Sequence, residues 1–94
     1  MKLQDLLKNI QPVEIAGDVE TEVTGVNIDS RKIKDSHLFV AMKGTQVDGH
    51  KFIPKAIELG AKSILCEDIP EEKVEGVTYV EVESTEDAVG KVAT

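Results

Sequence analysis

Apolar residues recur along this chain at two different spacings, which predict helices and strands in turn. One helical face is formed by four apolar residues near the start of the chain, Leu3, Leu6, Leu7 and Ile10. Pro12 follows them as a stop. Apolar and polar residues then alternate in residues 13–15 and again in residues 21–28, as they do in strands. We therefore expect a short amphipathic helix, followed by two strands joined by a turn.

The next apolar segments fit a strand, a helix and two further strands. Residues 37–42 are almost continuously apolar, as in a strand covered on both faces, and we place this strand in the centre of the sheet. Residues 52–59 carry a helical stripe, with Pro54 in the first turn and Gly60 as the carboxyl-terminal cap. Residues 63–66 and 77–82 predict two more strands. A strand, a helix and a strand in this order imply a parallel crossover.

A last helix is predicted to begin after Ser84, which has the side chain of an N-cap and is followed by Glu86 and Asp87 in the first turn. Its apolar face is Ala88, Val89 and Val92. The fold class that we predict is α/β, with a mixed, mostly parallel sheet flanked by helices. Since a chain of 94 residues cannot bury two cores, residues 1–94 are expected to form one domain.

The composition also predicts the cellular compartment of the protein. The longest apolar runs are far shorter than the ~20 residues of a membrane span, and Met1 and Lys2 lead into an amphipathic segment rather than an apolar signal core. A single cysteine, Cys66, excludes an internal disulfide and fits a reducing compartment. We therefore predict a cytoplasmic protein. Cys66 lies in an apolar run, which favours a buried small hydrophobe over a reactive thiol.

Charge is unevenly distributed along the chain. The net charge of −7 argues against nucleic-acid and anionic-membrane partners. Residues 31–62 nevertheless carry seven Lys and Arg against three acids, whereas residues 67–94 carry nine acids and two lysines. The basic middle third has two interpretations: a solvated helix face, or a local site for an anionic ligand.

Two polar loops interrupt the apolar framework, and each follows a predicted strand, where ligands of open α/β sheets usually bind. Asp29, Ser30 and Arg31 follow the first of these strands, and residues 44–50 follow the strand at 37–42. Loop glycines allow close backbone approach, and the start of the next helix offers unpaired N–H groups. The loops could hold a heterocycle and an anionic group. The alternative is ordinary turn chemistry, which uses the same residue types.

The sequence contains no other recognisable motif for phosphate binding, metal binding or acid catalysis. Gly90 and Lys91 do not belong to a G-x-x-x-x-G-K-[ST] phosphate loop. His37 and His50 have no neighbouring His or Cys, so no metal site is predicted, and His50 is expected to be a surface group or to support the site indirectly. Paired acids such as Glu71 and Glu72 fit solvated loops better than acid catalysis. We predict no catalytic residue and no cofactor in these 94 residues.

The two loops and the elements between them form one pattern: D-S-R at 29–31, L-F-V-A-x-x-G at 38–44, D-G-H at 48–50 and A-x-x-x-G-A at 56–61. This pattern resembles the amino-terminal domain shared by the MurE and MurF ligases of peptidoglycan synthesis. The resemblance covers residues 3 to about 94, and residues 3–7 and 52–56 resemble MurE more than MurF. Asp35 and Ser36 depart from it, because many relatives have a proline-glycine turn there.

The resemblance implies a three-domain, ATP-dependent parent ligase that forms an amide bond in the cytoplasm, for cell-wall synthesis, cell shape and cell division. Its central domain would bind ATP and Mg²⁺, and its carboxyl-terminal domain would help bind the incoming amino acid. This chain would correspond to the first domain alone, without catalysis of its own. Its partner would be the UDP end of UDP-N-acetylmuramoyl-L-alanyl-D-glutamate.

The resemblance also implies roles for particular residues. Ile28, Thr45, Gln46 and Val47 would lie against the uracil and ribose, and the Ser30 hydroxyl would bond the nucleotide. Charge alone adds Lys43 and Arg31, although Arg31 could equally brace the loop through Asp29 or Asp48. Two alternatives stay open: the same domain of a MurF ligase, and an acidic protein-interaction domain without a small ligand.

Overall fold

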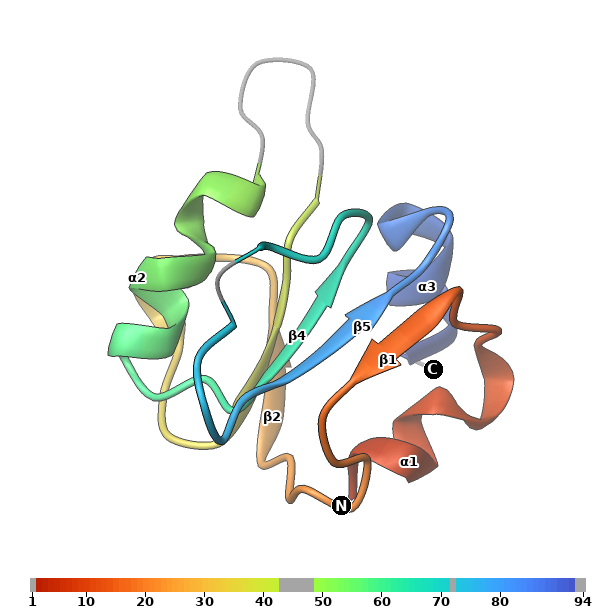
Figure 1. Cartoon of the computed structure of the whole chain (residues 1–94), viewed down its shortest axis with the longest axis horizontal. Helices are drawn as coiled ribbons and strands as arrows, with labels where there is room; N and C mark the ends of the chain where they lie inside the picture. Colours follow the sequence, from red (N-terminus) through yellow and green to blue (C-terminus); the bar gives the residue numbers. More distant parts are fainter. Residues whose placement is uncertain (1, 43–48, 72, 93–94) are drawn as a thin grey trace.

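The fold of the chain is a mixed sheet with helices on both faces. We describe it from a computed structural model in which residues 2–42, 49–71 and 73–92 are placed. Within these residues, five strands form one sheet in the order β1-β5-β4-β3-β2 (Figure 1). The strands are β1 (Glu14–Ala16), β2 (Gly25–Asn27), β3 (His37–Val40), β4 (Ser63–Cys66) and β5 (Thr78–Glu81). Strands β2 to β5 pair in parallel, and β1 pairs antiparallel with β5. The predicted fold class is confirmed.

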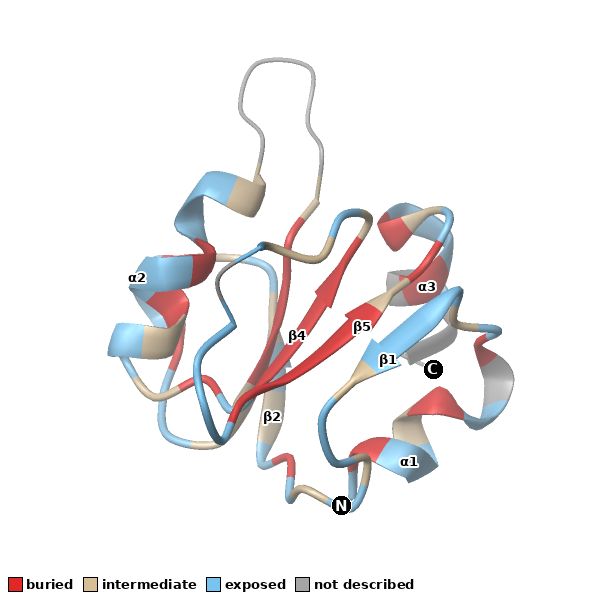
Figure 2. Ribbon diagram, viewed as in Figure 1, coloured by how far each residue is buried: buried red, intermediate tan, exposed pale blue. Residues whose placement is uncertain are grey.

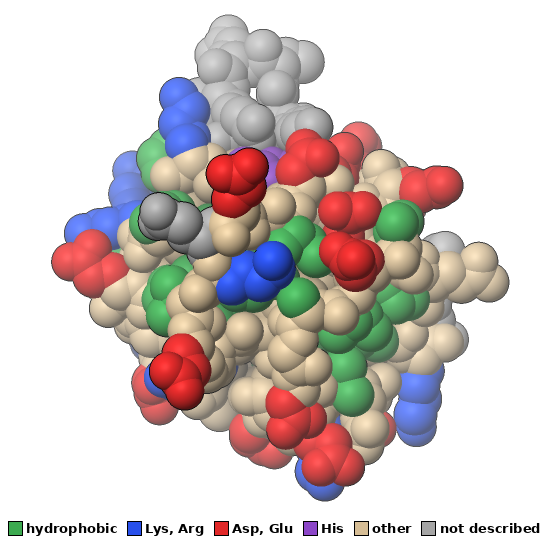
Figure 3. Space-filling view, viewed as in Figure 1, with side chains coloured by type: hydrophobic (Ala, Val, Ile, Leu, Met, Phe, Trp, Pro, Cys, Tyr) green, Lys and Arg blue, Asp and Glu red, His purple; other side chains and the backbone are tan. Residues whose placement is uncertain are grey.

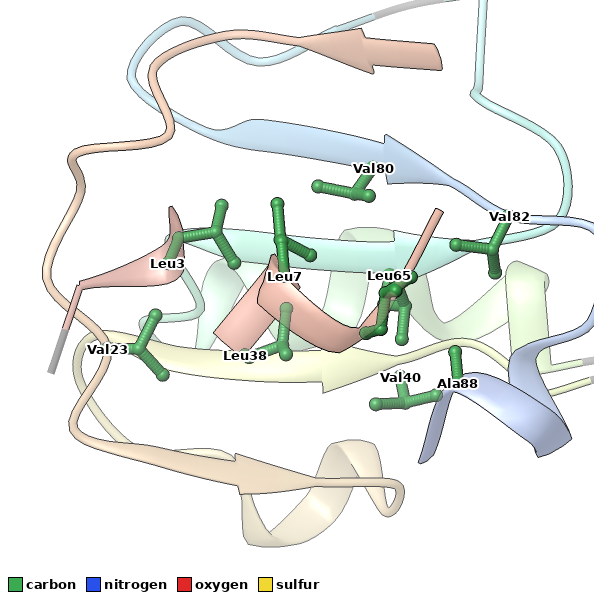
Figure 4. Packing of buried hydrophobic residues seen from close by; sticks show 10 residues of the cluster. Leu3, Leu7, Val23, Leu38, Val40, Leu65, Val80, Val82 and Ala88 are labelled. Atoms are coloured by element: carbon green, nitrogen blue, oxygen red, sulfur yellow. The ribbon is translucent and has the colours of Figure 1, made fainter. Parts of the chain in front are cut away.

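Helices cover the two faces of this sheet. In the described residues the α-helices are α1 (Leu3–Leu6), α2 (Ile53–Glu58) and α3 (Thr85–Val92), and the 3₁₀ turns are η1 (Leu7–Asn9), η2 (Ser30–Lys32) and η3 (Gly49–Phe52). Strand side chains alternate between the faces. Leu38, Leu65 and Val80 point to the side of α1 and α3, where they pack with Leu3 and Leu7 (Figure 4). The α2 face buries Phe39, Ile64, Tyr79, Ile53 and Ala56.

The helix predicted at residues 52–59 is confirmed as α2, with the predicted signals at both ends. Pro54 lies in its first turn. Gly60 follows it with a φ of +120°, and its N–H donates to the Ile57 carbonyl at 3.0 Å. A side chain at Gly60 would meet the Asp35 backbone at 2.9 Å, so the left-handed conformation and the close approach both require glycine here.

The helices predicted at the two ends of the chain are also confirmed. The first runs through α1 and η1. The last is α3, and the Ser84 hydroxyl accepts the Asp87 N–H at 3.3 Å, as expected of an N-cap. The strands predicted at 63–66 and 77–82 correspond to β4 and β5.

Two predictions about the sheet are wrong. The first two strands are not joined by a turn, because β1 and β2 lie at opposite edges of the sheet. The segment between them instead runs along α1, where Leu3 N–H donates to the Thr21 carbonyl at 2.9 Å and Gln4 N–H to the Val19 carbonyl at 2.8 Å. Burial of Val23 beside Leu3 fixes this path.

The strand at 37–40 is also not the central strand. Strand β4 is central, because β3 and β2 lie on one side of it and β5 and β1 on the other. All four of its residues are buried (Figure 2). Strand β3 is internal, between β4 and β2, so it is covered on both faces as its apolar run predicted. The described residues contain no helix that is long and apolar enough to cross a membrane.

Candidate functional site

The two polar loops predicted from the sequence start at neighbouring strand ends. Strands β2 and β3 pair in parallel, with Asn27 opposite Phe39, so their carboxyl ends lie at the same edge of the sheet. Residues 28–31 follow β2 at this edge, and residues 41 and 42 follow β3. Residues 43–48 lie outside the described part of the chain, and with them the predicted site residues Lys43, Thr45, Gln46 and Val47.

Ile28 and Ser30 offer different chemistry at this edge. Ile28 leaves 57% of its surface exposed, so an apolar side chain is accessible directly after the end of β2. Ser30 is 7% exposed and begins the turn η2, against which α2 packs. Its hydroxyl makes no hydrogen bond within the described residues. The hydroxyl of this mostly buried residue is thus available to a ligand that reaches the edge.

Arg31 braces the loop through Asp29. The Arg31 guanidinium donates from Nε and Nη2 to the two Asp29 carboxylate oxygens, each at 3.1 Å. The Arg31 backbone N–H donates to the same carboxylate at 2.9 Å. These hydrogen bonds, with the guanidinium charge, hold the pKa of the Asp29 carboxyl below its usual range and raise the pKa of Arg31. Of the two roles considered for Arg31, bracing through Asp29 is therefore present, and 85% of its side chain still faces solvent.

Met42 and Gly49 lie side by side at this edge. The Gly49 N–H donates to the Met42 carbonyl at 2.7 Å, which joins the residue after β3 to the start of η3. A side chain at Gly49 would meet the Met42 carbonyl oxygen at 2.7 Å and the Met42 nitrogen at 2.8 Å. Glycine is required here because of close backbone approach, as the loop glycines suggested.

His50 links two segments that are distant in sequence, which fits the second of its two predicted roles, indirect support. Its Nε2 accepts the backbone N–H groups of Glu67 at 2.9 Å and Asp68 at 3.2 Å, which ties η3 to the segment after β4. Glu67 in turn accepts from the Thr85 hydroxyl at 2.8 Å, at the start of α3. His50 is half-buried and supports the edge from behind rather than lying free on the surface. The D-G-H motif was its signal, but its partners are distant in sequence.

Comparison with known proteins decides the family. Residues 22–94 match the family described as "Mur ligase family, catalytic domain", which covers most of the chain. The chain belongs to the Mur ligase family. Its relatives include the UDP-N-acetylmuramoyl-L-alanyl-D-glutamate--2,6-diaminopimelate ligases of Bacteroides thetaiotaomicron, 62% identical over 94 residues, and of Cytophaga hutchinsonii, 33% identical over 94 residues. These matches cover 100% and 99% of this chain, and 20% and 19% of the relatives. This Mur ligase chain thus spans about a fifth of its relatives' length, and the predicted resemblance to MurE-type ligases is confirmed.

Solved Mur ligase structures share the fold. A crystal structure of MurF from Acinetobacter baumannii matches with a TM-score of 0.83 and 23% identity, over 96% of this chain and 19% of that one. MurF from Thermotoga maritima in complex with ADP matches with a TM-score of 0.61 and 32% identity, over 83% of this chain and 17% of that one. At 23% identity the first likeness shows the fold alone.

Two other groups singled out in the sequence have structural positions in this Mur ligase domain. Cys66 is fully buried in β4, and its thiol donates weakly to the Val80 carbonyl at 3.5 Å, which confirms a buried small hydrophobe. Lys51 and Lys55 are exposed on η3 and α2, and basic side chains gather on that side of the molecule (Figure 3). Lys55 pairs with Glu58 at 3.8 Å, as on a solvated helix face. The placed residues include no group of three His, Cys, Asp or Glu suited to a metal ion.

Replacement of Gly49 by alanine tests the close approach between Gly49 and the Met42 backbone. We expect Gly49→Ala to lower the free energy of unfolding by about 1–3 kcal/mol, because the new methyl group meets backbone atoms that cannot rotate away. Gly90→Ala is the matched control. Nothing lies within 4 Å of the site of its new methyl group, and a glycine in a helix costs about 0.5–1 kcal/mol relative to alanine, so this variant should be more stable. Urea denaturation of both variants checks the two signs, and a Gly49→Ala variant as stable as the parent would contradict the close approach.

Proposed function

We propose that this chain binds the UDP end of UDP-N-acetylmuramoyl-L-alanyl-D-glutamate as the substrate-docking domain of a longer, cytoplasmic, ATP-dependent ligase. That enzyme would add the third residue of the peptidoglycan stem peptide. The observation that carries the proposal is the edge where β2 and β3 both end, with the exposed Ile28 close to Ser30, a mostly buried residue with a polar hydroxyl. The names of the relatives support this substrate and favour diaminopimelate as the added residue.

Each group at the edge has a chemical part in this proposal. Ile28 offers an apolar surface to the flat uracil ring, and Ser30 donates its hydroxyl to the nucleotide. Arg31 adds positive charge for the diphosphate. Thr45, Gln46 and Val47 are proposed to complete the uracil and ribose contacts, and Lys43 to add a second cation. These contacts with the UDP end, far from the reacting carboxylate, would contribute binding and orientation rather than chemistry.

The residues of this chain do not fit the ATP and Mg²⁺ sites of the proposed ligase. The sequence contains no G-x-x-x-x-G-K-[ST] phosphate loop, and the described residues hold no carboxylate cluster for a metal ion. We therefore derive no step through either group from these residues. In this proposal, activation of the substrate carboxylate by ATP and formation of the amide bond belong to other parts of the longer protein.

A MurF-type ligase is the second candidate, because the solved structures with the same fold are MurF enzymes. The sequence relatives favour the MurE-type assignment, since one of them is 62% identical over the whole chain. An acidic interaction domain without a nucleotide is the third candidate. Chemical-shift mapping with UDP separates it from the others: shifts confined to residues 67–87, with none near Ser30, would overturn the proposed site.

Substitution of Ser30 tests the nucleotide contact. We expect Ser30→Ala to weaken UDP binding by about 0.5–1.5 kcal/mol for a neutral hydrogen bond, or up to about 3 kcal/mol if the hydroxyl meets a charged phosphate oxygen. Calorimetric titration with UDP gives the change. Ser84→Ala is the control, because the Ser84 hydroxyl caps α3. It should lower the melting temperature and leave UDP affinity unchanged, and equal affinities for Ser30→Ala and the parent would argue against the contact.

A further inference from the structure

An acidic residue lies inside the proposed anion site. Asp29 stands between Ile28 and Ser30, where an open carboxylate would repel a diphosphate. In the structure this carboxylate accepts three N–H groups of Arg31, at 2.9, 3.1 and 3.1 Å. The same contacts lower the pKa of Asp29, so it stays ionised at neutral pH and its charge is offset locally. At this edge the Asp29 carboxylate therefore holds Arg31 in place.

This support leaves part of Arg31 available. A guanidinium has five N–H donors in a planar fork, and Asp29 takes two of them. The Arg31 side chain is 85% exposed, so its remaining donors face solvent at the edge. Because two contacts fix the plane of the fork, the orientation of these donors is set before any ligand arrives. A lysine could not hold the carboxylate in this two-point geometry and point further donors outward.

Asp29 also fixes the backbone around Ser30. The Asp29 N–H donates to the Asn27 side-chain oxygen at 3.0 Å, and the Asp29 carbonyl accepts the Lys32 N–H at 3.0 Å. Together with the bond from Arg31 N–H, these contacts hold η2 on both sides of Ser30. The Asp29 side chain contributes one of these three contacts, the bond from the Arg31 N–H that spans Ser30, and the other two use the Asp29 backbone.

We propose that Asp29 is a positioning residue of the nucleotide site, which orients the Arg31 guanidinium towards the diphosphate and fixes the Ser30 turn. This inference rests on the proposed function and adds a residue that the charge of the ligand alone would exclude. It makes the D-S-R segment one unit: Asp29 positions, and Ser30 and Arg31 contact the ligand.

The test uses two substitutions that remove the same charge. Asp29→Asn and Asp18→Asn each make the chain less negative by one unit. Asp18 is a matched control because its carboxylate accepts the Glu20 N–H at 2.8 Å, across the same two-residue span, away from the edge. Charge alone predicts that both variants bind the anion UDP more tightly than the parent. Positioning predicts that Asp29→Asn instead binds UDP about three- to tenfold more weakly than Asp18→Asn, the effect of one or two lost hydrogen bonds.

Arg31→Lys gives an independent measurement that keeps both net charge and Asp29. It should lose a similar factor in UDP affinity, and Asp29→Asn should then cost little more in the Arg31→Lys background, because the two residues act together. Uridine serves as a second probe. It lacks the diphosphate, so the part of the loss that Arg31 carries should be absent for it.

The outcomes separate the inference from the proposed function. If the parent chain does not bind UDP in calorimetry, the proposed function fails and the inference fails with it. If the parent binds UDP and Asp29→Asn binds it as tightly as Asp18→Asn does, the inference alone is overturned. Weaker binding by Asp29→Asn, with a loss that shrinks in the Arg31→Lys background, supports it.

Discussion

The Cys66 thiol should react with a reagent such as DTNB at least roughly a thousandfold more slowly in the folded chain than in the unfolded chain at pH 7. The residue has no exposed surface in β4. Burial raises the pKa of its thiol from 9.0 to about 12, with smaller contributions from the charges of Glu81 and Asp68. A thiol with a pKa of about 12 is ionised at neutral pH roughly a thousandfold less than one with a pKa of 9.0, and steric protection adds to this.

Labelling of Cys66 can therefore report on unfolding, because the chain has a single cysteine. The rate should rise with urea in parallel with the loss of secondary structure. The sign of the pH effect follows from the raised pKa: the stability linked to the neutral thiol is complete below pH 9.0 and declines as the pH rises towards 12. Labelling at the rate of a free thiol without denaturant would show that β4 is not buried as described.

Phe39→Ala should lower the free energy of unfolding by about 3–5 kcal/mol. Phe39 is 1% exposed in β3 and packs under α2 with Ile64 and Ala56. Removal of its ring leaves a cavity between the sheet and the helix, and a domain of this size has a total stability of only about 5–15 kcal/mol. Thermal and urea denaturation followed by circular dichroism would measure the loss.

Phe52→Ala is the matched control for this substitution, since Phe52 is the other phenylalanine of the chain and is 39% exposed at the end of η3. It should lose clearly less stability, because part of its ring already faces water in the folded state. Equal losses in the two variants would mean that the α2 face is not the well-packed core described here.

Local signals in the sequence predicted the elements that depend on local chemistry. The apolar stripe, Pro54 and Gly60 define α2 almost completely, and Ser84 marks the start of α3. Strand order depends instead on contacts between distant residues. The alternating residues before and after Gly17 resemble a hairpin, yet pairing of the 19–22 segment with the start of α1 sends β2 to the far edge. No local pattern encodes that contact.

The same distinction applies to the candidate site. Polar residues after two apolar strands predicted where the edge would lie, and the structure brings the ends of β2 and β3 together there. Whether Arg31 braces the loop could be decided only from the geometry of Asp29, which shows the brace. The partners of His50, Glu67 and Asp68, could not be predicted because they follow a different strand.

The pairing of β1 has a consequence for how the chain is made. Among the described strands β1 pairs with β5, which is the last strand in the sequence. On the ribosome, the strand that emerges first therefore has no partner until residues 78–81 have left the exit tunnel, a delay of several seconds at roughly 5–20 residues per second. Meanwhile β2, β3, α2 and β4 can already assemble in order of synthesis. We therefore expect the nascent sheet to grow from β2, with the antiparallel pairing of β1 and β5 formed last.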